Sequence, residues 1–90
     1  MKVYGYTLYI VNAKYQTVKM PKGAEILNAG FQNGQLVLWA KVYPEHGLED
    51  RVIEIFGTGV EMPSLGPGQE RIYISTLQMN GYALHIFELK

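Results

Sequence analysis

Catalysis by a nucleophile needs a serine, threonine or cysteine beside a base, and this chain offers few such side chains. It contains no cysteine, its only serines are Ser64 and Ser75, and its only histidines are His46 and His85. Neither serine lies in a recognisable elbow motif. A partnership of Ser75 or Thr76 with His85 across a hairpin is conceivable, although such cross-strand pairs are more often packing contacts. The sequence therefore predicts a protein that is not an enzyme, and a weak hydrolase built on Thr76 and His85 stays an alternative.

Metal sites and acid–base pairs need several ligating or carboxylate side chains at matched spacings. The two histidines lie far apart in the chain, and Glu45, His46, Glu49 and Asp50 gather in one segment that is typical of a solvated turn. The remaining carboxylates show no spacing that would set two of them across a cleft. We expect no metal site, no cofactor and no glycosidase chemistry.

The stretch Phe56-Gly57-Thr58-Gly59 has the glycines of a phosphate-binding loop. It lacks the lysine and the following helix that such loops use, so it is not a nucleotide fingerprint. A Gly-x-Gly after a strand can still present backbone N–H groups to an anion. The plainer interpretation is a bulge and a turn.

The single tryptophan, Trp39, is the most informative side chain for binding, because an exposed indole supplies contact area and neighbouring amides supply direction. Lys41 and three amides are expected on the same face of the sheet: Asn28, Gln32 and Gln35. The alternative is that the indole covers the bare backbone at Gly30. A subunit interface is a further use of the same face.

Capture of a small anionic ligand would use aromatic rings, cations and backbone donors together. The candidate ligand-binding residues are Trp39, Tyr43 and Tyr73 for stacking, Lys41, Arg51 and Arg71 for phosphate, and Gly57, Thr58 and Gly59 for backbone hydrogen bonds.

Two Asn-Gly dipeptides, Asn33-Gly34 and Asn80-Gly81, predict tight β-hairpins, because both residue types tolerate the positive φ that a two-residue turn requires. The first turn sets Trp39 on a face that points away from the core. The opposite, core face is expected to carry Phe31, Leu36, Ala29, Leu38, Leu27 and Ala40.

The second turn pairs Met79 with Tyr82 and continues to a pairing of Ile74 with Phe87. One face of this hairpin then carries Leu77, Met79, Tyr82, Leu84 and Ile86, and the other carries Ile74, Thr76, Gln78, Ala83, His85 and Phe87. Both faces are largely apolar, so one is expected to meet the core and the other a second sheet or a subunit.

Three more β-branched and aromatic runs, over residues 3–11, 16–20 and 52–56, complete the expected strands. No stretch shows the apolar spacing of a helix over several turns. The sequence predicts one all-β domain over residues 1–90, an antiparallel β-sandwich or open barrel of about seven strands.

Charge and hydrophobicity exclude several classes of partner. Eight basic and eight acidic residues cancel, so the field that draws proteins to nucleic acid or anionic lipid is missing. A local cluster of Lys14, Lys19 and Lys22 is expected to be a solvated strand edge, with a small nucleic-acid contact as the alternative. No apolar run approaches the length of a membrane helix and no signal peptide is visible, so we expect no membrane partner and a cytoplasmic protein.

Several motifs follow one another along the chain. They are QTVKMPKGAEIL at 16–27, QNG at 32–34 leading to LWA at 38–40, FGTG at 56–59, and LQM at 77–79 with LHIFE at 84–88. In this order they resemble a family of short phage and prophage proteins of unknown function. The resemblance covers nearly the whole chain and implies a stand-alone protein in the host bacterial cell. It transfers no catalytic residue.

Small oligomeric phage proteins of this kind include counter-defence proteins that sequester nucleotide-type immune signals. The comparison with them is an analogy between classes of protein. On that analogy we expect a non-enzymatic homo-oligomer that holds a small anionic, nucleotide-like ligand between subunits. The alternative is a protein-interaction or virion accessory module that docks through an exposed apolar strand face.

Overall fold

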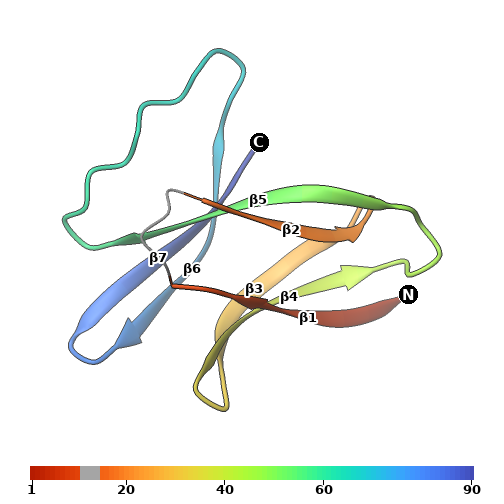
Figure 1. Cartoon of the computed structure of the whole chain (residues 1–90), viewed down its shortest axis with the longest axis horizontal. Helices are drawn as coiled ribbons and strands as arrows, with labels where there is room; N and C mark the ends of the chain where they lie inside the picture. The colour runs from red at the N-terminus through yellow and green to blue at the C-terminus, as the bar shows by residue number, and fades with distance from the viewer. Residues whose placement is uncertain (11–14) are drawn as a thin grey trace.

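The computed structural model describes residues 1–10 and 15–90, which form seven antiparallel strands and contain no helix (Figure 1). In chain order the strands are β1 (Lys2–Leu8), β2 (Gln16–Pro21), β3 (Glu25–Gln32), β4 (Gln35–Val42), β5 (Leu48–Gly57), β6 (Arg71–Met79) and β7 (Tyr82–Leu89). The predicted all-β class is confirmed.

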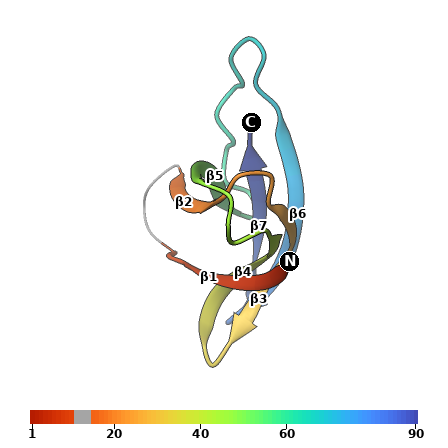
Figure 2. The ribbon, with the colours of Figure 1, turned by 90° about the vertical axis from the view of Figure 1, so that its right-hand side faces the viewer.

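The strands form two layers. One is a three-stranded sheet in the order β1-β4-β3, and the other is a four-stranded sheet in the order β2-β5-β7-β6. The chain is flat, with extents of 40 × 38 × 18 Å, and the view at right angles shows its narrow side (Figure 2). Strands β3 and β6 are in contact, so they close the sandwich on one side.

The core lies between the sheets and follows the alternation of strand residues. Its largest fully buried side chains come from four different strands: Met20, Leu38, Val42, Ile53 and Ile86. In β4, Leu36, Leu38 and Ala40 point inward as the sequence predicts. Trp39 therefore lies on the outer face of the three-stranded sheet.

Both predicted tight turns are confirmed. Asn33 and Gly34 have φ values of 51° and 77°, and Asn80 and Gly81 have values of 46° and 88°. The first turn sets the expected pairing from Gln32↔Gln35 to Asn28↔Trp39. The second sets it from Met79↔Tyr82 to Ser75↔Ile86.

Beyond these pairs the predicted registers are wrong, because each hairpin contains a bulge. In β3 the partner of Ala40 is Ile26, and Leu27 is the extra residue, with 46% of its surface exposed instead of lying in the core. In β6 the partner of Phe87 is Tyr73, and Ile74 is the extra residue, packed against the core. Phe31, also predicted in the core, is 38% exposed near the hairpin tip.

The two bulges occur where the sheets meet. Ser75, next to the β6 bulge, accepts a hydrogen bond from the Ala29 N–H at 2.9 Å and donates to Asn28 Oδ1 at 2.5 Å. A bulge bends its strand and re-aims the neighbouring side chains. The bends allow two strands of different sheets to approach and satisfy a buried hydroxyl at their junction.

Some predicted boundaries also change. The strand expected over residues 3–11 ends at Leu8, and residues 11–14, including Lys14 of the predicted basic cluster, lie outside the described residues. The strand expected from Val52 begins at Leu48, so Asp50 lies within β5 and pairs with Lys19 at 2.7 Å. In residues 1–10 and 15–90 we find no helix long and apolar enough to cross a membrane.

The β3 bulge makes adjacent residues respond differently to truncation. Ile26→Ala should lower the free energy of unfolding by about 2 kcal/mol, because Ile26 packs against the core. Leu27→Ala should change it by less than about 0.5 kcal/mol, because this side chain is exposed. Urea unfolding measures both changes in the free energy of unfolding. A larger loss of stability for Leu27→Ala than for Ile26→Ala would contradict the bulge and favour the register predicted from the sequence.

Candidate functional site

The outer face of the three-stranded sheet centres on Trp39. Strand β4 lies between β1 and β3, so this side chain has a cross-strand neighbour on either side, Gly5 on β1 and Asn28 on β3. Side chains on one face of a strand alternate, so Trp39 shares this face with Val37 and Lys41. The indole is half-buried although it points away from the core.

Two glycines make room for the indole to lie across the sheet. A Cβ atom at Gly30 would lie 3.0 Å from Cζ3 of Trp39, and one at Gly5 would lie 3.3 Å from its Nε1 and 3.1 Å from Cγ1 of Val37. The benzene side of the indole therefore rests over β3 and the pyrrole side over β1. Covering of Gly30, the alternative from the sequence, is thus what the structure shows, with Gly5 as a second covered position.

The polar neighbours of the indole are fewer than the sequence predicts. Lys41 lies two residues after Trp39 on β4, in the next cross-strand row, where it pairs with Val3 on β1 and Glu25 on β3. Its Nζ is 3.4 Å from Glu25 Oε1. Asn28 uses its Oδ1 for the Ser75 hydroxyl and the Ala29 N–H. Gln32 and Gln35 lie at the hairpin end of the sheet. Lys41 is thus the predicted phosphate-binding cation that the structure brings to the indole.

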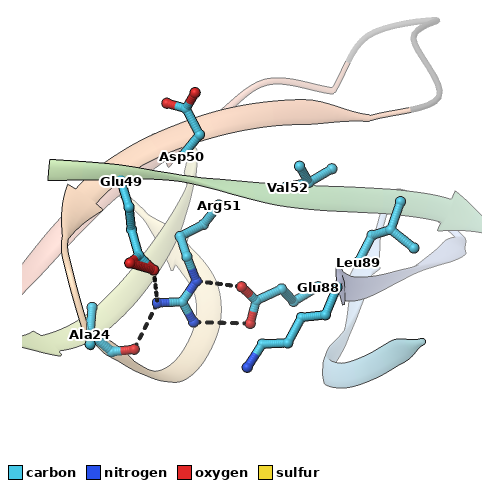
Figure 3. A pocket seen from close by; sticks show the side chains of 9 residues that line it. Ala24, Glu49, Asp50, Arg51, Val52, Glu88 and Leu89 are labelled. Carbon is cyan, nitrogen blue, oxygen red and sulfur yellow. Dashed lines mark hydrogen bonds and ion pairs between the residues drawn. The ribbon is translucent and has the colours of Figure 1, made fainter. Parts of the chain in front are cut away.

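Arg51 lies away from Trp39, in a buried ion pair at the opening between the sheets (Figure 3). Its Nε and Nη2 donate to the two carboxylate oxygens of Glu88 at 2.5 and 3.0 Å, and its Nη1 donates to the Ala24 carbonyl at 2.8 Å. Hydrogen bonding to Glu88 raises the pKa of the Arg51 guanidinium. The charge therefore serves to tie β5, β7 and the start of β3 together.

A cavity of about 530 Å³ opens beside this ion pair. Glu49 and Glu88 contribute carboxylates to its lining, against Arg51 and Lys90 as cations, whereas the Asp50 side chain points to the other side of β5 and pairs with Lys19 (Figure 3). Because these charges balance and Arg51 is already held by Glu88, the cavity has no excess positive charge to attract an anion.

Arg71 is also paired, on the outer face of the four-stranded sheet. Its Nε donates to Glu54 Oε1 at 2.7 Å, its Nη2 donates to the Pro63 carbonyl at 2.6 Å, and its guanidinium lies 5.4 Å from the centre of the Phe56 ring. Glu54 is 3% exposed. Neither predicted arginine therefore joins Trp39, and each neutralises a buried carboxylate.

Hydroxyl groups form a chain through His85 on that same outer face. Thr58 Oγ1 is 2.7 Å from Nε2 of His85, Thr76 Oγ1 is 3.1 Å from Nδ1, and Tyr73 Oη is 2.7 Å from Thr76 Oγ1. The structure thus brings together Thr58, Tyr73, Thr76 and His85. Ser75 points to the opposite face and binds β3, so its suggested partnership with His85 is wrong.

The remaining predicted residues lie at the ends of strands. The Tyr43 ring stacks on His46 in the β4–β5 connection, with ring centres 5.2 Å apart. In the Gly57-Thr58-Gly59 segment the Thr58 N–H donates to the Ala83 carbonyl, and the Val60 N–H closes a turn on Gly57. The interpretation as a turn therefore describes this segment.

Within the part of the chain that the structure describes, no three acidic or histidine side chains form a group that could hold a metal ion. Sequence reasoning missed Gly5, Glu54 and Glu88. Gly5 has no signal of its own, because its role appears only once β1 is paired with β4. The two glutamates look like ordinary strand residues until the tertiary fold buries them beside the arginines.

Comparison with known proteins supplies a family. A family model described as a domain of unknown function, DUF7352, matches residues 1–90. The chain belongs to the DUF7352 family. No curated protein and no solved structure shows significant similarity to it. The DUF7352 assignment confirms the expected membership in a family of unknown function.

In this DUF7352 chain, the packing of the Trp39 indole against Gly30 can be tested with an alanine substitution. Gly30→Ala should displace the indole and destabilise the fold by about 1–2 kcal/mol, because the new methyl group would lie 3.0 Å from Cζ3. Emission from the single tryptophan should shift at the same time. Gly47→Ala, where nothing lies within 4 Å, is the control and should leave the emission unchanged. Equal spectra for the two variants would contradict the packing described above.

The buried ion pair gives a second test. Glu88→Gln should lower the free energy of unfolding by about 3 kcal/mol, because it leaves the buried Arg51 charge with only the more exposed Glu49, 3.8 Å away. The double variant Arg51→Met with Glu88→Leu should recover most of that loss, because no uncompensated charge remains. Denaturant unfolding would contradict this account if the double variant were the less stable of the two.

Proposed function

We propose that this protein is a non-enzymatic binding domain that captures a small planar anionic ligand, of the nucleotide type, on the Trp39 face. The observation that carries the proposal is the indole lying across Gly5 and Gly30 with the Lys41 ammonium in the next row. An aromatic face stacks on a heterocyclic base, and a nearby cation attracts its phosphate. The half-buried indole loses little freedom on binding, since its position is already set by the sheet.

The buried ion pairs of Arg51 and Arg71 narrow the choice of the cation that would bind the ligand's phosphate. Both guanidiniums are held by carboxylates with side chains less than 7% exposed, so a phosphate would have to displace an internal partner. Lys41 is held only by an exposed pair with Glu25 at 3.4 Å, which solvent screens. We therefore assign the ligand's charge to Lys41 and its ring to Trp39.

The resemblance to phage and prophage proteins adds a biological setting to the proposal, an infected bacterial cell. A protein that holds a nucleotide-type immune signal without cleaving it would act as a counter-defence protein in the host bacterial cytoplasm. Such a role needs affinity and no catalytic constellation, which agrees with a face that offers one indole and one lysine to a ligand.

Incubation with cyclic dinucleotides and cyclic ADP-ribose forms tests the proposal. The protein should deplete one of them from solution and release it intact on heating. Trp39→Leu should weaken binding about tenfold or more by calorimetry, since stacking contributes about 1–3 kcal/mol per base. Lys41→Gln should weaken binding of the nucleotide and leave the matching nucleoside unaffected.

Tyr82→Leu is the matched control, because this exposed aromatic ring lies on β7, in the other sheet. Equal depletion of the ligand by the wild-type protein and the Trp39→Leu variant, or no depletion by the wild-type protein, would contradict the proposal. A cleaved product would instead indicate an enzyme, and His85→Ala would then show whether the hydroxyl chain takes part.

A protein-interaction or virion accessory module is the second candidate. The observation that favours it is the set of exposed apolar side chains at the start of β1, where Met1 is 71%, Val3 60% and Tyr4 37% exposed. Stoichiometric binding to one defined phage or host protein, with no nucleotide absorbance, would support this candidate.

A further inference from the structure

Strand β1 forms one edge of the three-stranded sheet. It pairs with β4 on one side, and no strand among residues 1–10 and 15–90 pairs with it on the other (Figure 1). An edge strand presents a row of unpaired backbone groups that can pair with another chain.

The turn at Asn33-Gly34 determines which backbone groups of β1 face outward. The residues that close a two-residue hairpin exchange hydrogen bonds, so Gln35 and every second residue after it bond to β3. The intervening residues, Leu36, Leu38 and Ala40, then bond to β1.

The β1 partners of those intervening residues are Leu8, Tyr6 and Tyr4. Because bonding alternates along an antiparallel strand, Val3, Gly5 and Thr7 turn their N–H and C=O groups to the outer edge.

The other three edge strands carry features that discourage pairing. Strand β2 has Lys19 and ends in Pro21, and β3 and β6 are bulged and in contact with each other. Lysine, proline and bulges are the usual means of protecting an edge. Between Val3 and Leu8 strand β1 has none of these.

The sequence around Gly5 is nearly palindromic. Tyr4 and Tyr6 flank the glycine, and Val3 and Thr7, which have the same branched shape, lie one step further out. A twofold interface requires that residue i meet residue j while j meets i. A β1 strand paired antiparallel with itself about Gly5 meets this requirement, with Val3 opposite Thr7 and Tyr4 opposite Tyr6.

We propose that β1 pairs with β1 of a second copy about a twofold axis at Gly5, making one continuous sheet with three strands from each copy. The pairing uses the outward backbone groups of Val3, Gly5 and Thr7. It also covers the exposed apolar side chains of Val3 and Tyr4, 60% and 37% exposed in the single chain.

The dimer would enlarge the Trp39 face, a consequence that rests on the proposed function. The Gly5 residues of the two copies would lie side by side, with the pyrrole side of one indole over each of them. Strands in a sheet are about 4.8 Å apart, so the backbones of the two Trp39 residues would be about 14 Å apart, and the indoles would extend toward each other across the two β1 strands. A ligand with two bases would fit such a shared face better than a mononucleotide.

Size-exclusion chromatography with light scattering tests the pairing. The wild-type protein at about 100 μM should have twice the 10.2 kDa mass of the chain. Thr7→Pro removes an outward N–H and leaves the bonds to β4 intact, so it should be monomeric, whereas Thr7→Val should remain dimeric. A monomeric wild type, or a dimeric Thr7→Pro variant, would overturn the proposal, and a monomer that binds a single base would leave the proposed function standing.

Cross-linking gives an independent check of the register, which does not depend on how well the proline variant folds. The chain has no cysteine, so Val3→Cys with Thr7→Cys introduces the only two thiols. In the proposed dimer the thiol at position 3 of each copy faces the thiol at position 7 of the other copy, within the range of a disulfide. Oxidation should give a covalent dimer on a non-reducing gel, and Val3→Cys alone should not. No cross-link, or equal cross-linking in both variants, would contradict the pairing about Gly5.

Discussion

Antiparallel register along β4 is the constraint on which the rest of this structure depends. The Asn33-Gly34 turn can close with only one set of partners, and from that point every second residue of β4 points to the core and every second one outward. Leu36, Leu38 and Ala40 are thereby buried and Trp39 is placed outside. The same alternation decides which backbone groups of β1 face away from β4, so the indole face and the inferred dimer have one common origin.

Both arginines of this protein serve inside the fold. Arg51 and Arg71 each hold a glutamate that the fold buries, and each also bonds a backbone carbonyl, of Ala24 and Pro63 respectively. Such pairs are costly to break, because removing one partner leaves a desolvated charge. They link segments that the sheets alone do not join: β7 with the start of β3, and β5 with the long β5–β6 connection. What remains for binding on the Trp39 face is the aromatic ring and one half-buried lysine.

A chain of this size has little surface to bury, and this one measures 40 × 38 Å with a thickness of 18 Å. The flat shape leaves many apolar side chains at the surface, including those of β1. An added copy at the β1 edge would cover part of this surface without changing either core. In that arrangement Gly5 serves twice, as the floor for an indole and as the centre of a self-complementary strand.

The local sequence was sufficient to predict the all-β class, both hairpin turns and the outward position of Trp39, because Asn-Gly pairs and strand alternation act over a few residues. It could not predict the bulges at Leu27 and Ile74, since these arise where β3 meets β6 and Ser75 needs partners on another sheet. The candidate site divides in the same way. Trp39 and Lys41 were found from the sequence because they share one strand face, whereas Gly5 was missed because its contact with the indole needs strands far apart in the chain to pair. The tertiary structure alone decided that Arg51 and Arg71 face internal glutamates, because burial of a carboxylate depends on packing between segments that no local pattern joins.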